Sequence, residues 1–250
     1  MASPKDHCDI CGKSLTARDF EKGRAVILLR KAWCRSCAER TVEKSKEKRP
    51  SKPASGSHKS RSTTKSKLPA PAPSGWTPKS GDHACSTYSS EAERAAQIAR
   101  FLSEGLRNKE KVIYAVDELS GERVLGYLQK EGLPADRYLR SGQFEIHSTQ
   151  SVYAPGGTFD PSEMIARIKI LTDQAIKEGY LGLRGTGEMT WALRGWPGSE
   201  RLVEYELRLS AALRGGRCVA LCQYDASRFS SSLLRQLKAA HPHVIAPATA

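Results

Sequence analysis

The chain has 250 residues, a net charge of +13 and 39% hydrophobic residues, which suits one α/β domain and a small additional module. Residues 1–25 are polar, so no secretory signal is expected, and no apolar run reaches the roughly 20 residues of a membrane-spanning helix. These features argue against a secreted or integral membrane protein. We therefore expect a cytoplasmic protein that has no membrane partner and whose seven cysteines stay reduced.

Four cysteines near the amino terminus stand in two pairs, Cys8-x-x-Cys11 and Cys34-x-x-Cys37, with 22 residues between the pairs. In a reducing compartment such pairs are more often metal ligands than disulfides. Each pair can direct two thiolates at one ion from a tight turn, and four thiolates complete a tetrahedral zinc site. The spacing therefore predicts one structural Zn²⁺ bound by these four cysteines.

The segments around the cysteines predict a compact module. Residues 25–29 are typical of a short apolar strand, and Gly23 is available for a hairpin turn. Residues 38–48 have a helix-forming composition. We therefore expect a zinc ribbon or treble-clef-like module over residues 1–44.

The positive charge is concentrated in the first part of the chain. Residues 1–38 carry a net of +4 and residues 39–67 a net of +7, hence +11 on residues 1–67. Residues 45–78 are rich in Ser, Lys and Pro without hydrophobic periodicity, which predicts a disordered linker. Such a segment attracts nucleic acid or other polyanions without sequence preference. The alternative, that the charge only keeps the linker soluble and extended, stays open.

Residues 79–250 alternate short apolar runs with helical patterns. The runs at 111–117 and 217–225 are continuous, as expected of parallel strands buried on both faces. Helix-start signals occur at Ser90 and Asp160. This alternation predicts an α/β domain with a mostly parallel sheet and helices on both faces. Further strands are expected at 81–88, 144–147, 180–183 and 244–246, and helices at about 91–106, 121–130, 161–178, 199–214 and 230–240.

A glycine-bearing stretch at residues 179–191 is the expected centre of a binding site. The strand at 180–183 is predicted to open into a polar loop at residues 185–188. In open α/β sheets, ligands bind beyond the carboxyl ends of the strands, and glycines let the backbone approach a ligand closely. The alternative is a loop whose glycines only make a turn.

Polar and aromatic residues are expected to gather at this edge of the sheet. Arg184 and Glu188 flank the two glycines, although they could instead pair with each other or with Asp225. No phosphate-binding loop, Gly-x-Ser-x-Gly elbow or other catalytic constellation is visible. The predicted ligand-binding residues are His83, Cys85, Tyr153, Arg184, Glu188, Trp191, Tyr224 and Asp225, with Asp117, His147 and Glu206 in support.

Short motifs in the large domain carry a family resemblance. They are Gly81-Asp-His-Ala-Cys with Tyr88, Phe101-Leu-x-x-Gly-Leu106 before Glu110-Lys-Val, Gly156-Gly-Thr-Phe-Asp160, Glu178-Gly-Tyr-x-Gly-Leu-Arg184, Gly187-Glu-Met-x-Trp191, Tyr205-Glu206, Leu221-Cys-Gln-Tyr-Asp225 and His241-Pro242. In this order they resemble the MEDS family, a sensory domain named for methanogens, methylotrophs and a dichloromethane-responsive repressor. The resemblance implies a RecA- or KaiC-type α/β domain that has lost its phosphate-binding loop.

The resemblance also implies a function. Members of the family are proposed to sense a small molecule, such as a hydrocarbon derivative, and to signal to an attached DNA-binding or histidine kinase module. Here the attached module is the predicted zinc module. We therefore expect a non-enzymatic sensor, active in signal transduction or transcription regulation, whose residues 1–67 contact DNA or a protein. The alternatives are a nucleotide-binding or ATPase-like enzyme of the RecA class and a protein-docking scaffold.

Overall fold

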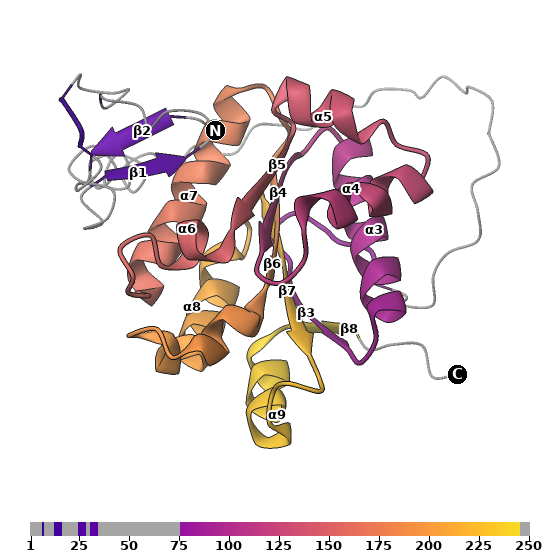
Figure 1. Ribbon diagram of the computed structural model, residues 1–250, viewed down its shortest axis with the longest axis vertical. Helices are drawn as coiled ribbons and strands as arrows, with labels where there is room; N and C mark the ends of the chain where they lie inside the picture. Colours follow the sequence, from indigo (N-terminus) through magenta and orange to yellow (C-terminus); the bar gives the residue numbers. More distant parts are fainter. Residues whose placement is uncertain (1–6, 8–12, 17–24, 29–30, 35–75, 246–250) are drawn as a thin grey trace, which may run out of the picture.

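The computed structural model describes residues 7, 13–16, 25–28, 31–34 and 76–245 (Figure 1). Among these residues, no helix combines the length and apolar character needed to cross a membrane. Most of the described residues belong to one layered α/β unit, which begins near Trp76.

In the amino-terminal part, strand β1 (Ala25–Leu28) pairs antiparallel with β2 (Lys31–Cys34). An isolated antiparallel bridge joins His7 to Ser14. The hairpin partner follows β1 in the chain, so Gly23 does not lie between the two paired strands as we expected. The strand prediction for residues 25–29 is confirmed over the four residues of β1.

The predicted zinc ligands lie almost wholly outside the described residues. This is true of Cys8, Cys11 and Cys37, while for Cys34 only the backbone, at the end of β2, is described. The predicted helix at 38–48 lies outside them as well, as does the linker up to residue 75. The zinc module and the linker therefore stay predictions.

A six-stranded sheet forms the centre of the large domain. Its strand order is β5-β4-β6-β7-β3-β8, and every neighbouring pair is parallel. Parallel strands joined by helices are the arrangement that the sequence predicted. The strands are β3 (His83–Tyr88), β4 (Lys111–Val116), β5 (Phe144–Ser148), β6 (Leu183–Glu188), β7 (Cys218–Asp225) and β8 (His243–Ile245).

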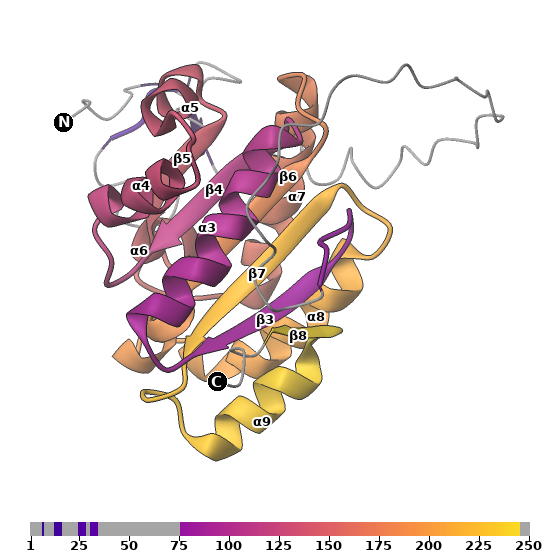
Figure 2. The same cartoon turned by 90° about the vertical axis from the view of Figure 1, so that its right-hand side faces the viewer.

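Helices cover both faces of this sheet (Figures 1 and 2). Each face has its own buried core, because side chains alternate between the two faces along every strand. One face carries α3 (Glu91–Arg107), α4 (Gly121–Lys130) and α5 (Ala135–Ser141). The other carries α6 (Thr149–Tyr153), α7 (Pro161–Lys177), α8 (Leu202–Leu213) and α9 (Ser231–Ala240), with 3-10 turns η1 (Met189–Arg194) and η2 (Ser199–Arg201) after β6.

The helix-start signals in the sequence act as expected. The Ser90 hydroxyl accepts a hydrogen bond from the backbone N–H of Glu93 at the start of α3. The Asp160 carboxylate accepts from the backbone N–H groups of Ser162 and Glu163 at the start of α7. These bonds satisfy donors that have no partner within the helix, so they set where each helix begins.

The expectation of a loop at residues 185–188 is wrong. These residues belong to β6, which lies between β4 and β7 in the interior of the sheet. Gly185 pairs in register with Ile113 on one side and with Ala220 on the other. Hydrogen-bond ladders on both edges hold this backbone in place, so the glycines act through their missing side chains rather than as a hinge.

Candidate functional site

The side chains of β6 alternate between the two faces of the sheet, and this determines which of them lie on the same face. Side chains of a strand point alternately to opposite faces of the sheet. On the face covered by α7 and α8, two of the three positions are glycines, which leaves the sheet surface bare beneath these helices. That face has Leu183, Gly185 and Gly187, whereas Arg184 and Glu188 point toward α3.

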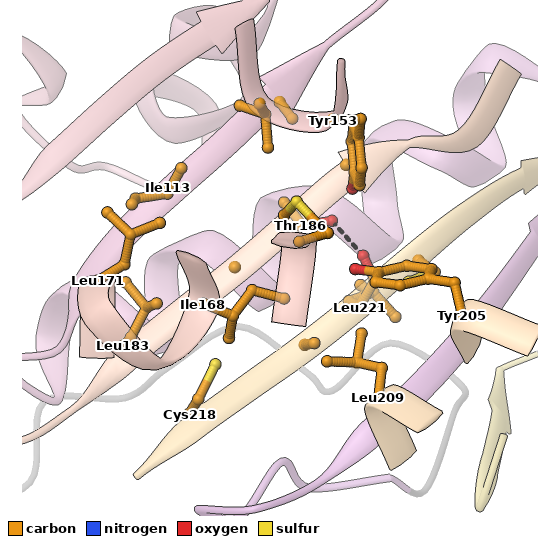
Figure 3. A pocket seen from close by; sticks show the side chains of 17 residues that line it. Ile113, Tyr153, Ile168, Leu171, Leu183, Thr186, Tyr205, Leu209, Cys218 and Leu221 are labelled. Atoms are coloured by element: carbon orange, nitrogen blue, oxygen red, sulfur yellow. Dashed lines mark hydrogen bonds between the residues drawn. The ribbon is translucent and has the colours of Figure 1, made fainter. Parts of the chain in front are cut away.

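A cavity of about 60 Å³ lies over the two glycines (Figure 3). Strands β4, β6 and β7 form its floor, α7 and α8 form its roof, and the end of α6 closes one side. Its lining is mostly aliphatic. Since one water molecule needs about 10–15 Å³ of cavity volume, the space can hold a small organic molecule. The main apolar contributors are Ile113, Met164, Ile168, Leu171, Leu209 and Ala220.

Two tyrosines supply the polar atoms of the cavity. Tyr153 and Tyr205 are both buried, and Figure 3 shows their hydroxyls pointing toward the same space. Burial raises the pKa of each hydroxyl well above its ordinary value, so both stay neutral donors. Among the described residues, neither hydroxyl has a hydrogen-bond partner. Two free donors in an apolar space can bind one polar atom of a ligand.

Gly187 and a group of aromatic rings position Tyr153. A Cβ on Gly187 would collide with the Tyr153 hydroxyl, so any larger residue here would displace the Tyr153 ring. The Tyr153 ring stacks on Trp191 with centroids 4.7 Å apart, and Phe159 packs 4.7 Å from Trp191. Trp191, a predicted ligand-binding residue, thus backs Tyr153 and does not line the cavity.

Glu188 lies on the opposite face, where protein groups satisfy its carboxylate. It accepts hydrogen bonds from the Tyr114 hydroxyl at 3.2 Å and from the backbone N–H groups of Glu118 and Leu119 at 2.7 and 3.3 Å. The Arg94 guanidinium lies 3.9 Å away. Glu188 therefore joins the end of β6 to the segment that follows β4.

Arg184 lies near the start of β6, away from the carboxyl edge where we expected it. Its Nε donates to Glu110 at 2.5 Å, Nη1 donates to the Phe101 carbonyl at 3.2 Å, and the guanidinium lies over the Phe101 ring. Gly105 provides room for the side chain. Four strand residues span roughly 13 Å, so Arg184 and Glu188 do not pair with each other.

Two carboxylates at the carboxyl edge hold connecting segments. Asp225 accepts hydrogen bonds from the backbone and hydroxyl of Ser227 in the turn after β7, and it does not pair with Arg184 or Glu188. Asp117 accepts from the hydroxyls of Thr149 and Thr190. His147, on β5, pairs with Glu145 on its own strand. Contacts within the protein therefore account for the polar groups of Asp117, His147 and Asp225 without a ligand.

A buried polar cluster adjoins the cavity on the α8 side. Its centre is Glu206, whose side chain is fully buried. Its carboxylate lies 3.2 Å from His83 Nε2, 3.3 Å from His241 Nε2 and 3.5 Å from Cys222 Sγ, and it accepts a 2.5 Å hydrogen bond from Tyr224. Cys222 also lines the cavity. The structure thus brings His83 and Tyr224, two predicted residues, to Glu206.

Electrostatics keep Glu206 ionised. Burial by itself raises the pKa of its carboxyl, but the neighbouring His241 and His83 outweigh burial and hold the pKa well below its usual range. For His241, burial is the largest single influence and lowers the pKa, but the Glu206 carboxylate and the Leu237 carbonyl together outweigh burial, so the pKa is raised. For His83, burial dominates and the pKa is lowered. Cys85, level with Cys222 across the sheet, is a buried thiol whose pKa burial raises to about 12.

Sequence reasoning missed several residues of this region. His241 and Tyr205 were not predicted as site residues, and neither was any residue of α7. A usable signal was present: glycines two residues apart leave one face of a strand without side chains. Reading residues 185–188 as a loop hid that signal.

Comparisons with known proteins identify a family and one curated relative. The profile of one family, described as "MEDS: MEthanogen/methylotroph, DcmR Sensory domain", matches residues 82–242. A curated relative, the transcriptional repressor DcmR of Methylorubrum extorquens, is 27% identical over 152 residues, which are 60% of this chain and 54% of that protein. The chain thus spans about half the length of this relative.

A solved structure also resembles the chain. It is a KaiC-like protein from Pyrococcus horikoshii OT3, with a TM-score of 0.47 and 14% identity, and the match covers 67% of this chain and 71% of that one.

Proposed function

The chain belongs to the MEDS family of sensory domains, and on that premise we propose that its α/β domain is a non-enzymatic sensor of a small, mostly apolar molecule. The ligand binds in the cavity over Gly185 and Gly187. Its apolar part contacts the aliphatic lining, and a polar atom accepts hydrogen bonds from Tyr153 and Tyr205. A hydrocarbon derivative with one electronegative atom has this chemistry.

The main support for this proposal is the cavity itself. Protein interiors are close-packed, and a cavity lined by apolar groups lowers stability unless a ligand fills it. Two glycines in the middle of a central strand also forgo packing that any larger side chain would supply. A ligand-binding site accounts for this loss of packing. Binding without reaction is favoured because no activated nucleophile lines the cavity.

The connection between β3 and α3 supports a sensor over the nucleotide-binding alternative. Only Ser89 and Ser90 join the two elements. A phosphate-binding loop needs a longer, glycine-rich connection whose N–H groups face the phosphates. Here the Glu93 carboxylate accepts from the Ser89 N–H, and Glu91 adds a second negative charge in the first helical turn. Both charges repel phosphate from the helix start.

The output of the sensor is proposed to lie in residues 1–67. The relative is a transcriptional repressor, which suggests DNA as the partner, and these residues carry most of the positive charge. The four amino-terminal cysteines, Cys8, Cys11, Cys34 and Cys37, would hold a structural Zn²⁺ in that module. A ligand signals only through different affinities for two conformations, so the cavity must differ between the active and inactive forms.

Thermal unfolding with dichloromethane and xenon as probes tests the proposal. A ligand that binds only the folded state raises the unfolding midpoint in proportion to the logarithm of its concentration over Kd. We expect this rise for the wild-type chain. Gly185→Val should abolish it and leave the protein folded, because a Cβ at Gly185 meets no atom within 4 Å and extends into the cavity.

Gly126→Val in α4 is the matched control. A Cβ at this position also has open space, and the residue lies on the other side of the sheet from the cavity. This variant should respond to both probes like the wild type. Equal responses by Gly185→Val and wild type would place any ligand elsewhere and contradict the proposed site.

A further inference from the structure

The cluster around Glu206 has the dimensions of a metal site. Its four potential ligand atoms all lie within 4.8 Å of one another. Bonds of about 2.0–2.3 Å to a tetrahedral ion place neighbouring ligand atoms roughly 3.3–3.8 Å apart. Four of the six separations are close to this: 3.2 and 3.3 Å from Glu206 to His83 and His241, 3.4 Å from His83 to Cys222, and 3.5 Å from Cys222 to Glu206.

Hydrogen bonds orient both histidines in the same way. Ser210 donates its only hydroxyl proton to the Ala240 carbonyl, so its oxygen accepts from His83 Nδ1–H at 2.8 Å. His241 Nδ1 donates to the Leu237 carbonyl at 2.7 Å. Both rings therefore turn Nε2 toward the centre of the cluster. Metal-bound histidines are usually held in this manner, with the second ring nitrogen donating to a carbonyl or an oxygen.

One polar atom in the cluster lacks a protein partner of suitable geometry. His241 Nε2 is buried, and it forms no hydrogen bond within the described part of the chain although Glu206 is near. Buried polar atoms are almost always paired, so an isolated one calls for an explanation. A cation at the centre of the cluster would be its partner.

Charge balance favours a divalent ion. Glu206 contributes one negative charge, and metal binding would displace the Cys222 thiol proton to solvent and contribute a second. The two charges together neutralise a divalent cation, so the filled site adds no net charge to the interior. Imidazole and thiolate ligands suit zinc and similar transition metals, whereas magnesium and calcium take oxygen ligands.

We propose that His83, Glu206, Cys222 and His241 bind a four-coordinate divalent metal of the zinc type inside the α/β domain. Four protein ligands leave no open position, which makes the site structural rather than catalytic. The ion joins β3, β7, α8 and the residue that follows α9. The metal ion would also hold the Cys222 side chain in one position, and this side chain forms part of the wall of the cavity.

The experiment uses the full chain with Cys11→Ser and Cys37→Ser, which removes two ligands of the separate site predicted at the amino terminus. After chelator treatment, this background protein is loaded with Co²⁺ or Zn²⁺, and metal content is measured by mass spectrometry. We expect about one ion per chain. Cobalt should show the visible bands of four-coordinate geometry and a near-ultraviolet thiolate-to-metal band.

A pair of cysteine variants in this background tests whether Cys222 is the cysteine that binds the metal. Cys222→Ala should lose the near-ultraviolet band and weaken metal binding by more than about 100-fold, the largest loss usual for a residue that only hydrogen-bonds to a metal ligand. Cys218→Ala should retain both, because Cys218 is a buried thiol on the same face of the same strand and lies outside the cluster. His83→Gln should also weaken binding, and circular dichroism checks that each variant is folded.

The outcomes are distinct. Zinc should raise the unfolding midpoint of the background protein and of Cys218→Ala, but not of Cys222→Ala or His83→Gln. A background protein that takes up no metal would overturn the proposal. Indistinguishable metal content and spectra for Cys222→Ala and Cys218→Ala would overturn it too. Neither result depends on whether the neighbouring cavity binds a small molecule.

Discussion

Arg184 illustrates how a single residue can belong to the family pattern and yet lie away from the cavity. The residue is 1% exposed, and its guanidinium contacts the Glu110 carboxylate and the Phe101 carbonyl. It joins the start of β6 to α3 and to the residue before β4. Its role in the structure is to hold these elements together, and the same holds for Glu188 at the other end of the strand.

Replacing Arg184 tests this structural role. Arg184→Met should lower the free energy of unfolding by about 2–3 kcal/mol without any ligand, because it leaves the Glu110 carboxylate without its buried partner. Urea denaturation measures the loss. Arg208→Met, which breaks an exposed ion pair with Glu204, should cost less than about 1 kcal/mol. Equal costs for the two variants would refute the structural reading of Arg184.

At the scale of elements, a buried ion network joins the edge strand β5 to β4. Lys111 Nζ on β4 lies 3.0 Å from Glu145 on β5 and 2.9 Å from Glu178, the residue that caps the end of α7. His147 donates to Glu145 from the same strand. Burial alone raises the pKa of Glu145, but the hydrogen bonds and charges of His147 and Lys111 together outweigh burial and hold the pKa below its usual value.

This network predicts a pH dependence. A carboxyl whose pKa is lowered by folding contributes stability above its unfolded pKa of about 4.5, and the contribution is lost as pH falls through the folded pKa. Glu145→Gln should therefore be less stable than wild type at pH 7, and the difference should shrink below about pH 4.5. Urea denaturation of both proteins between pH 7 and 3 measures it. A difference that stays constant over this range would contradict the prediction.

For the whole molecule, the uneven charge is the main feature. Residues 1–67 carry +11 of the net +13. If these residues contact nucleic acid through the backbone, affinity should fall at least about tenfold between 50 and 200 mM salt and depend little on sequence. Fluorescence anisotropy with two unrelated DNA duplexes measures this for the full chain. A fragment of residues 76–250 should lose most of the binding, and equal affinity for this fragment would place the basic surface in the α/β domain.

Local patterns in the sequence were sufficient for much of the architecture. The apolar runs at 111–117 and 217–225 became central parallel strands, and Ser90 and Asp160 cap the helices that they were predicted to begin. These features depend on contacts within a few residues, so they can be read from short windows. The loop prediction at 185–188 failed because glycine is a local signal for turns, whereas here pairing with β4 and β7 overrides it.

The sequence by itself determined the alternation of strands and helices, the helix starts and the uneven charge, because each follows from neighbouring residues. Only the tertiary structure decided which polar groups meet. The crossovers bring His83, Glu206 and His241 together from three distant segments, whereas Arg184 and Glu188, four residues apart, stay separated along one strand. Such contacts depend on strand order and on which face each side chain takes, and neither is encoded in local spacing.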